Sequence, residues 1–259
     1  KINLKTRCLA RLGGLCYRLG AMSSTDKQAP AETARDKRLN RWQRPLVTWW
    51  DRVLAWTNSL VIDHAFIRAI YLNSHQISSR AWRSAQPMPY QIRDFAKKGV
   101  KTIISLRGGQ TFGSLPLEKE ACSDNGLIFL NFVFRSRSLP TREELISAEQ
   151  LLSKVSYPVL FHCKSGADRA GFMAAFFMMV AEGRSLDEAR DQLSPRYGHI
   201  KQGKTGVLDA FFDAYQAQTG GNVSLMEWVR TDYDRDLIQK TFEPTGWGSL
   251  LTEGLLRRE

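Results

Sequence analysis

The chain has 259 residues, of which 43% are hydrophobic, 10% aromatic and 24% charged. This composition is typical of a soluble globular protein, and four cysteines are too few for a small disulfide-rich scaffold. No apolar run approaches the ~18 residues of a membrane-spanning helix, and no repeat of about 20–50 residues is visible. We therefore expect one domain with extensions.

The net charge of +11 is unevenly distributed along the chain. Residues 1–45 carry 11 Lys/Arg and 3 Asp/Glu, a net of +8, whereas residues 46–259 carry 26 and 23, a net of +3. A nucleic-acid-binding domain would carry its charge on a folded face, so we expect no nucleic-acid partner. The pattern instead predicts an arm that meets an anionic surface, or a solvated tail.

The N-terminal segment 1–41 is expected to be this basic, disordered arm, since residues 23–40 are polar and rich in Ala, Lys and Arg. The first residue is Lys1 rather than methionine, which indicates a fragment or a processed chain. Met22 is an alternative start, in which case Lys1–Ala21 would not belong to the native chain.

The segment 42–72 predicts an amphipathic helical region. Large apolar residues recur there at spacings of three and four, as on one face of a helix: Trp42, Leu46, Trp49, Val53, Trp56 and Leu60. A helix over Trp42–Leu60 either docks on the body of the protein or lies in a membrane interface, where tryptophans are favoured. Together with the arm, residues 1–60 would then meet an anionic membrane surface.

From Ala81 onward, apolar strand patterns alternate with helical ones. The expected strands are Ala81–Ala85, Val100–Leu106, Leu127–Phe134 and Pro158–His162. The expected helices are Pro89–Lys98, Leu115–Asn125, Thr141–Val155, Arg169–Ala181, Ser185–Leu193, Thr205–Gln218 and Ser224–Lys240. This order predicts an α/β fold with a mostly parallel central sheet flanked by helices, and with helical extensions at both ends.

The most informative motif begins with His162 and Cys163 at the end of a buried strand. Arg169 follows six positions later, at the start of an apolar helix, with Gly166 in the loop between them. Backbone N–H groups and a helix N-terminus make such a loop a cradle for an oxyanion. The same field favours a thiolate at Cys163, the form that acts as a nucleophile, and the planar fork of Arg169 suits two phosphate oxygens.

This motif resembles the Cys-x5-Arg loop of cysteine-based phosphatases of the tyrosine and dual-specificity superfamily. The segments Trp82–Pro87 and Thr102–Gly108 also resemble the opening strands of compact bacterial and plant atypical dual-specificity phosphatases. The resemblance implies a phosphatase domain at residues 73–220, followed by a C-terminal helical extension at 221–259. It also implies phosphomonoester hydrolysis through a phosphocysteine on Cys163, on a phosphoprotein or a phosphorylated lipid or inositol.

The general acid departs from the family pattern, because the segment 131–138, where the family has an aspartate, contains no carboxylate. Asp168 is the candidate acid, since myotubularin-type lipid phosphatases have an aspartate at this position of the loop. The alternative is that Asp168 only forms a salt bridge or caps the helix that begins at Arg169. Weaker candidates are Glu118, Glu120 and Asp124.

A second departure is Ala170, where the family usually has a serine or threonine whose hydroxyl stabilises the departing thiolate. Ser165 is a partial substitute within the loop. The missing hydroxyl predicts slow hydrolysis of the phosphocysteine, or a phosphate-binding module with low turnover. A third hypothesis, from a different class, is a peripheral-membrane scaffold that works through its N-terminal segment.

The candidate substrate-binding residues include the loop residues Ser165, Gly166 and Ala167. Basic side chains join them: Lys164, Arg107, Arg135 and Arg137. Together they would suit a substrate with more than one phosphate. His162 is expected to orient the loop, and His199 either positions the hydrolytic water or is structural.

We expect no cofactor, because the loop chemistry needs no metal and the cysteines and histidines form no metal-binding pattern. A catalytic thiol must stay reduced, which predicts a cytoplasmic setting. The basic N-terminal segment adds the alternative of a peripheral position on the inner face of the membrane.

Overall fold

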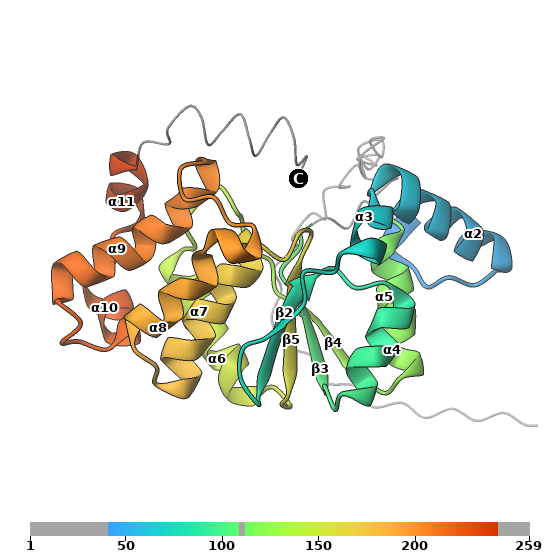
Figure 1. Ribbon diagram of the computed structural model, residues 1–259, viewed down its shortest axis with the longest axis horizontal. Helices are drawn as coiled ribbons and strands as arrows, with labels where there is room; N and C mark the ends of the chain where they lie inside the picture. The colour runs from blue at the N-terminus through green and yellow to red at the C-terminus, as the bar shows by residue number, and fades with distance from the viewer. Residues whose placement is uncertain (1–40, 109–111, 243–259) are drawn as a thin grey trace, which may run out of the picture.

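The computed structural model describes residues 41–108 and 112–242 (Figure 1). Its centre is a five-stranded sheet in the order β1-β2-β5-β3-β4. The strands are β1 (His75–Gln76), β2 (Ala81–Ala85), β3 (Thr102–Ser105), β4 (Ile128–Asn131) and β5 (Val159–Cys163). Only the short edge strand β1 is antiparallel, which confirms the predicted mostly parallel sheet.

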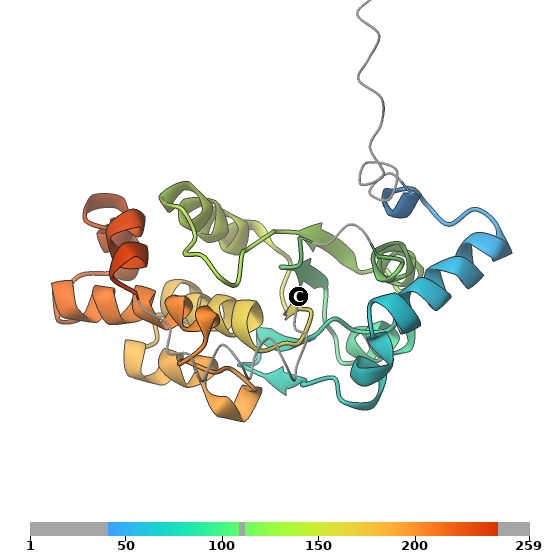
Figure 2. The same ribbon diagram turned by 90° about the horizontal axis from the view of Figure 1, so that it is seen from above.

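Helices cover both faces of this sheet (Figures 1 and 2). One face packs against α4 (Pro89–Lys97) and α5 (Ser114–Asp124). The other face is covered by α7 (Asp168–Glu182), which contacts β2 and β5. Five further helices complete a larger helical layer around α7: α6 (Arg142–Lys154), α8 (Leu186–Arg190), α9 (Val207–Thr219), α10 (Leu225–Thr231) and α11 (Arg235–Thr241). Short 3₁₀ turns link several of these: η2 (Asp191–Leu193), η3 (Pro195–Tyr197) and η4 (Lys204–Gly206).

The central strand β5 is buried on both faces, which explains its continuous apolar sequence. Its side chains alternate between two cores, so that Phe161 joins the core of the larger helical layer and Leu160 joins the core under α4 and α5. Cys163 is the last residue of β5 and lies between β2 and β3 at the carboxyl end of the sheet. Ligands of open α/β sheets bind at this end.

The predicted single helix Trp42–Leu60 is wrong. A first helical turn ends near Gln43, and α2 (Trp49–Thr57) begins only after Thr48, which forms a capping box with Asp51. The cause is visible in the sequence, because Pro45 disfavours helical backbone in the residue before it. The segment continues as the π-helical turn η1 (Asn58–Ile62) and then α3 (Ala65–Ile70).

The predicted helix Ser224–Lys240 is likewise two helices, α10 and α11. The break lies at Asp232–Asp234, where the Asp234 side chain accepts a hydrogen bond from the Leu237 amide and starts α11. Both helices contribute to the core of the larger helical layer, through Trp228 and Ile238 among others. The predicted arm 1–41 lies almost wholly outside the described residues, as does the end of the predicted extension from residue 243.

No helix in the described part of the chain combines the length and the hydropathy that a membrane span requires.

Candidate active site

The loop between β5 and α7 runs beneath the end of β2. Cys163 is 2% exposed, and Gly166 has a left-handed backbone with φ of +75°. A Cβ atom on Gly166 would lie 2.5 Å from the backbone nitrogen of Ala85, so only glycine permits this approach. The sequence of the loop therefore fixes its path directly against the sheet.

Two buried side chains hold the carbonyl groups of the loop. The amide nitrogen Nδ2 of Asn73 donates to the Ser165 carbonyl at 3.1 Å. The guanidinium of Arg83 donates to the carbonyls of Gly166 and Ala167 at 2.7 and 2.9 Å. Three successive loop carbonyls thus face these donors. Neither Asn73 nor Arg83 was a candidate from the sequence, although Arg83 lies in the segment Trp82–Pro87 that carries the family resemblance.

Arg83 is fully buried, and its neighbours compensate its positive charge. Burial lowers the pKa of its guanidinium to about 10, although the charges of Cys163, Tyr197 and Asp168 favour the protonated form. The guanidinium also donates to the backbone carbonyl of Gln192 at 2.5 Å and lies 4.2 Å from the centre of the Tyr197 ring. The buried cation therefore lies within electrostatic range of Cys163.

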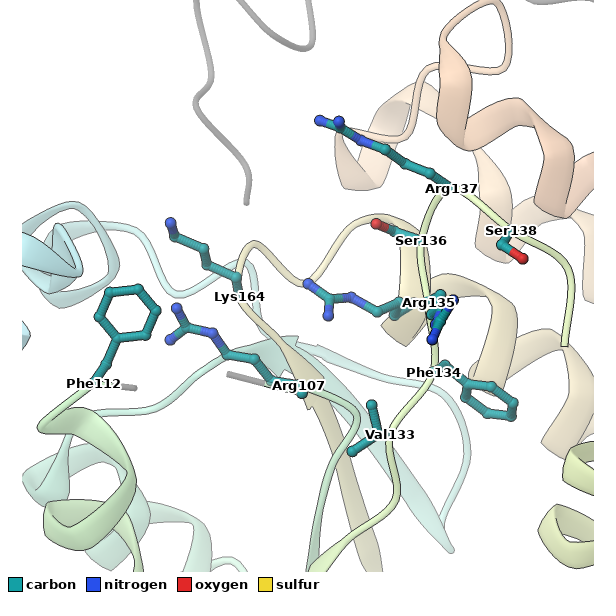
Figure 3. Close-up of a pocket in the computed structure, with 11 residues that line it drawn as sticks. Arg107, Phe112, Val133, Phe134, Arg135, Ser136, Arg137, Ser138 and Lys164 are labelled. Atoms are coloured by element: carbon teal, nitrogen blue, oxygen red, sulfur yellow. The ribbon is translucent and has the colours of Figure 1, made fainter. Parts of the chain in front are cut away.

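A pocket of about 530 Å³ opens beside the loop (Figure 3). Five cationic side chains line it: Arg107, Arg135, Arg137, Lys164 and Arg169. None of the described lining residues carries a carboxylate. Figure 3 shows Phe112 and Lys164 on one side of the pocket and the segment 133–138 on the other. Burial and the nearby arginines, Arg107 first, lower the pKa of the Lys164 ammonium. Such a pocket suits a multiply charged anion.

The segment 135–138 occupies the place where the family carries its acid, and α11 holds it. Arg235 donates to the hydroxyl of Ser138 at 2.7 Å and to the carbonyl of Leu139 at 2.9 Å. Gln239 accepts a hydrogen bond from the Ser138 hydroxyl at 3.1 Å. The pocket wall therefore depends on residues that lie beyond the predicted boundary at residue 220.

Arg107 lines the pocket, but its guanidinium binds two scaffold residues, Asp63 and Gln86. It forms a buried ion pair with Asp63 and donates to Gln86 at 2.5 Å. Burial raises the pKa of Asp63, yet the bonds to Arg107 and the charge of Arg68 outweigh it and leave the pKa below its ordinary value. Asp63 ties the N-terminal segment to the pocket, and its role has no local signal in the sequence.

His162 faces Glu118 rather than the loop carbonyls that we expected it to orient. Its Nε2 atom lies 2.7 Å from Oε1 of Glu118, and both side chains are fully buried. Glu118 also accepts a hydrogen bond from Gln86 at 2.7 Å. Glu118 is thus part of the scaffold under the loop. Glu120, another weaker acid candidate, pairs with Arg52 on α2.

Asp168 and His199 form a buried group together with Asp209 of α9. The two ring nitrogens of His199 lie 2.7 Å from Oδ1 of Asp168 and 2.6 Å from Oδ2 of Asp209. Burial lowers the pKa of His199, but the hydrogen bonds to the two carboxylates prevail and raise it to about 9. His199 is therefore an imidazolium at neutral pH and donates to both. Asp209 was not predicted.

The predicted site residues thus divide into two sets according to whether they line the pocket. The cations lie in the pocket wall, whereas Cys163, Asp168 and His199 are buried and are not among the lining residues. Asp168 immediately precedes Arg169, so the two sets meet in the loop. Among residues 41–108 and 112–242, no three His, Cys, Asp or Glu side chains are grouped as a metal site requires.

A buried cysteine at the end of a central strand, a carbonyl-anchored loop and an arginine at the following helix define a cysteine-based phosphatase of the tyrosine and dual-specificity superfamily. The chain belongs to the family described as "DSP-PTPase phosphatase fused to NAD+ Kinase", whose model matches residues 62–206. The matched region is more than half of the chain and contains the whole loop.

Among curated relatives, the dual specificity protein phosphatase TpbA of Pseudomonas aeruginosa strain UCBPP-PA14 is 25% identical over 161 residues. The match covers 59% of this chain and 64% of TpbA, so the chain spans less than two thirds of that relative's length. The TpbA homologue of strain PAO1 is 25% identical over 131 residues, 47% of this chain and 53% of its own length.

Solved structures with a similar fold include two related phosphatases. The crystal structure of P. aeruginosa TpbA has 20% identity and a TM-score of 0.45, and the match covers 65% of this chain and 89% of that one. The structure of PTPMT1 in complex with PI(5)P has 19% identity and a TM-score of 0.43, with coverage of 56% and 98%. Because both TM-scores lie below 0.5, the family assignment rests on the family model.

Proposed function

We propose that the chain hydrolyses phosphate monoesters through a phosphocysteine intermediate on Cys163. The observation that carries this proposal is the anchoring of three successive loop carbonyls by Asn73 and Arg83. Carbonyls held outward favour amide groups that face the anion, and preorganised donors of this kind stabilise the charge of a phosphoryl transition state. Arg169, which lines the pocket, supplies a bidentate partner for two phosphate oxygens.

The reaction has two steps. The thiolate of Cys163 attacks phosphorus, an S–P bond forms, and the P–O bond to the leaving group breaks. The leaving oxygen takes up a proton and departs as an alcohol. Water then attacks the phosphocysteine, the S–P bond breaks and the thiolate returns. One proton of the water leaves with the inorganic phosphate, and the other restores the group that protonated the leaving oxygen. No step requires an oxidant or a cofactor.

For the leaving-group proton we retain Asp168 as the donor, with His199 as its source. His199 carries a proton at neutral pH and directs Nδ1 at Asp168 across 2.7 Å. Transfer along this bond gives a neutral Asp168 carboxyl when the leaving oxygen develops negative charge. The contrary assignment is that the ionised Asp168 only positions the start of α7, and substrates with different leaving groups distinguish the two.

The substrate class follows from the charge of the pocket. Five cationic side chains line a volume of about 530 Å³, and although Arg107 is paired with Asp63, the lining carries more positive charge than one phosphate dianion requires. We propose a substrate that carries a further anionic group near the scissile phosphate, on a phosphoprotein or on a phosphorylated lipid or inositol.

The test is the rate of aryl phosphate hydrolysis by Cys163→Ser beside Cys122→Ser. Cys122 is the other described cysteine, is buried in α5, and serves as the matched control for loss of a buried thiol. Turnover should vanish in Cys163→Ser and persist in folded Cys122→Ser. Rapid acid quenching of the wild-type reaction should trap protein heavier by one phosphoryl group, and that adduct should be absent from Cys163→Ser. Full activity in Cys163→Ser would refute the proposal.

A second candidate function, phosphate binding with low turnover, is supported by Ala170. This residue is fully buried at the start of α7 and offers no hydroxyl to the departing thiolate. If breakdown of the phosphocysteine is slow, aryl phosphate should give a burst of one phenol per protein and then a slow steady state. Tight vanadate binding without a burst would favour the binding module.

A further inference from the structure

Exposed apolar side chains concentrate on one segment of the molecule. Fifteen large hydrophobic residues of the described chain are strongly exposed, and eleven of them lie between positions 47 and 71. We call these eleven residues the apolar surface: Val47, Trp49, Trp50, Val53, Leu54, Val61, Ile62, Phe66, Ile67, Ile70 and Tyr71. Single exposed apolar residues are ordinary, but eleven of them within one short segment make that segment a candidate interaction site.

The orientation of α3 is the reverse of what its sequence would normally adopt. Helix α3 buries Arg68, which is 4% exposed, and presents Ile67 and Ile70, which are 54% and 88% exposed. A helix on the surface of a soluble protein normally places its apolar stripe against the core. In α2 the two stacked tryptophans Trp49 and Trp50 also face solvent, with ring centres 3.7 Å apart.

Buried contacts on the inner side of α2 and α3 fix the orientation of these helices. Arg68 donates to the carboxylate and the backbone carbonyl of Asp63 at 2.8 and 3.0 Å. On α2, Ala55 is fully buried and lies so close to Gly113 that a Cβ atom there would meet the Ala55 carbonyl oxygen at 2.4 Å. The side chain of Asn58 accepts a hydrogen bond from the Gly113 amide at 2.8 Å. The apolar surface is therefore a fixed feature of the fold.

The segment that carries the apolar surface is also tied to the pocket. Residues 64–72 lie between two anchors, Asp63, which pairs with Arg107, and Asn73, which donates to the Ser165 carbonyl. One anchor reaches a pocket-lining side chain and the other reaches the catalytic loop. Figure 1 shows α2 and α3 beside the end of the sheet from which this loop emerges.

The positive charge of the pocket distinguishes between two candidate partners of this surface, a second copy of the chain and a lipid bilayer. A second copy of the chain seated on this surface would bring two cationic pockets together, at a cost in electrostatic repulsion. An anionic bilayer meets both features at once, because its hydrocarbon boundary accepts tryptophan and aliphatic side chains while its phosphates approach the cations.

We propose that the apolar surface seats the chain on an anionic lipid bilayer, and that the pocket takes the phosphate of a phosphorylated lipid in that bilayer. The inference rests on the phosphatase function proposed above and narrows its substrate to lipids. It assigns α2 and α3 the task of presenting the pocket to the membrane plane.

The first experiment measures binding with the full chain carrying Cys163→Ser, so that no turnover alters the lipid. Vesicles of phosphatidylcholine with phosphatidylserine should carry the protein upward in flotation. Ile67→Ser/Ile70→Ser should reduce bound protein at least tenfold, whereas the matched pair Ile128→Ser/Leu237→Ser, which removes exposed residues elsewhere, should bind as the parent does. A second measurement needs no variant: vesicles brominated near the head group should quench tryptophan fluorescence.

The second experiment separates this inference from the phosphatase function. With an active Cys163, Ile67→Ser/Ile70→Ser should hydrolyse a soluble aryl phosphate and a short-chain phosphatidylinositol phosphate within twofold of wild type. It should lose at least tenfold on the long-chain lipid in vesicles. The inference fails if wild type does not bind anionic vesicles, if both double variants bind equally, or if wild type hydrolyses phosphopeptides but no phosphorylated lipid. A dimer that Ile67→Ser/Ile70→Ser dissociates would likewise assign the surface to a second copy.

Discussion

His199 and Asp168 are 31 positions apart in the chain, yet Nδ1 of the imidazole lies 2.7 Å from Oδ1 of the carboxylate. Asp209 approaches the other ring nitrogen at 2.6 Å, so an imidazolium lies between two carboxylates next to the Cys163–Arg169 loop. This arrangement stores a proton one hydrogen bond away from the only carboxylate of the Cys163–Arg169 loop. It also couples the charge of the loop to the packing of α9.

The first prediction concerns the leaving group. Asp168→Asn removes the proposed proton donor but keeps a side chain of the same size and an oxygen for His199. We expect kcat/KM to fall at least about a hundredfold on an alkyl phosphate, whose leaving oxygen needs a proton, and less than tenfold on an aryl phosphate with an acidic phenol. The measurement is a comparison of kcat/KM over a series of leaving groups.

The matched variant for this test is Asp209→Asn, which touches the same imidazole from the far side. It should affect the alkyl phosphate less than Asp168→Asn does, because the bond between His199 and Asp168 remains. Equal losses on alkyl and aryl phosphates in Asp168→Asn would show that Asp168 serves only the architecture of the loop.

The second prediction is a pH-dependent stability. Because the folded pKa of His199, about 9, exceeds its ordinary 6.5, the charged histidine stabilises the fold fully below pH 6.5, and this contribution is lost as the pH rises through 9. A shift of this size corresponds to about 3 kcal/mol. The free energy of unfolding of wild type should therefore fall between pH 6.5 and 9 relative to that of His199→Gln, as measured by urea titration at each pH.

The third prediction concerns Asp63, which compensates two buried cations. Asp63→Asn leaves Arg107 and Arg68 without their carboxylate, and we expect a loss of about 3–5 kcal/mol in the free energy of unfolding. Glu120→Gln, which breaks the more exposed pair with Arg52, should have little effect. Chemical denaturation of both variants measures the difference. A loss no greater in Asp63→Asn than in Glu120→Gln would contradict the structural role assigned to Asp63.

Several features of the site were predictable because their determinants are local in the sequence. Cys163, Gly166 and Arg169 lie within seven positions, and the apolar run before them allows only a buried strand. The expected helix Thr141–Val155 is likewise local, and α6 begins there with a capping box between Thr141 and Glu144. Alternation of such strands with helical patterns then sufficed for the parallel sheet.

The partners of the loop were not predictable, since each crosses a large sequence separation. Asn73 reaches Ser165 across 92 positions and Arg83 reaches Gly166 across 83. A single sequence contains no periodicity that pairs such residues, and buried arginines are too rare to expect. The helix prediction over Trp42–Leu60 failed for a different reason, because the apolar spacing was followed through Pro45, which ends the first helical turn.

The last prediction concerns Arg83, whose fork holds two loop carbonyls and the backbone of Gln192 at once. Lysine in its place keeps the positive charge near Cys163 but cannot bond all three acceptors in one plane. We therefore expect Arg83→Lys to keep the thiolate reactive toward iodoacetamide while kcat falls about 10–100-fold and vanadate binds more weakly, because the amides are no longer preorganised. The matched control is Arg80→Lys, three positions earlier, whose exposed guanidinium donates to a single carbonyl, that of Ala181. Similar kinetics for both variants would mean that the loop keeps its shape without Arg83.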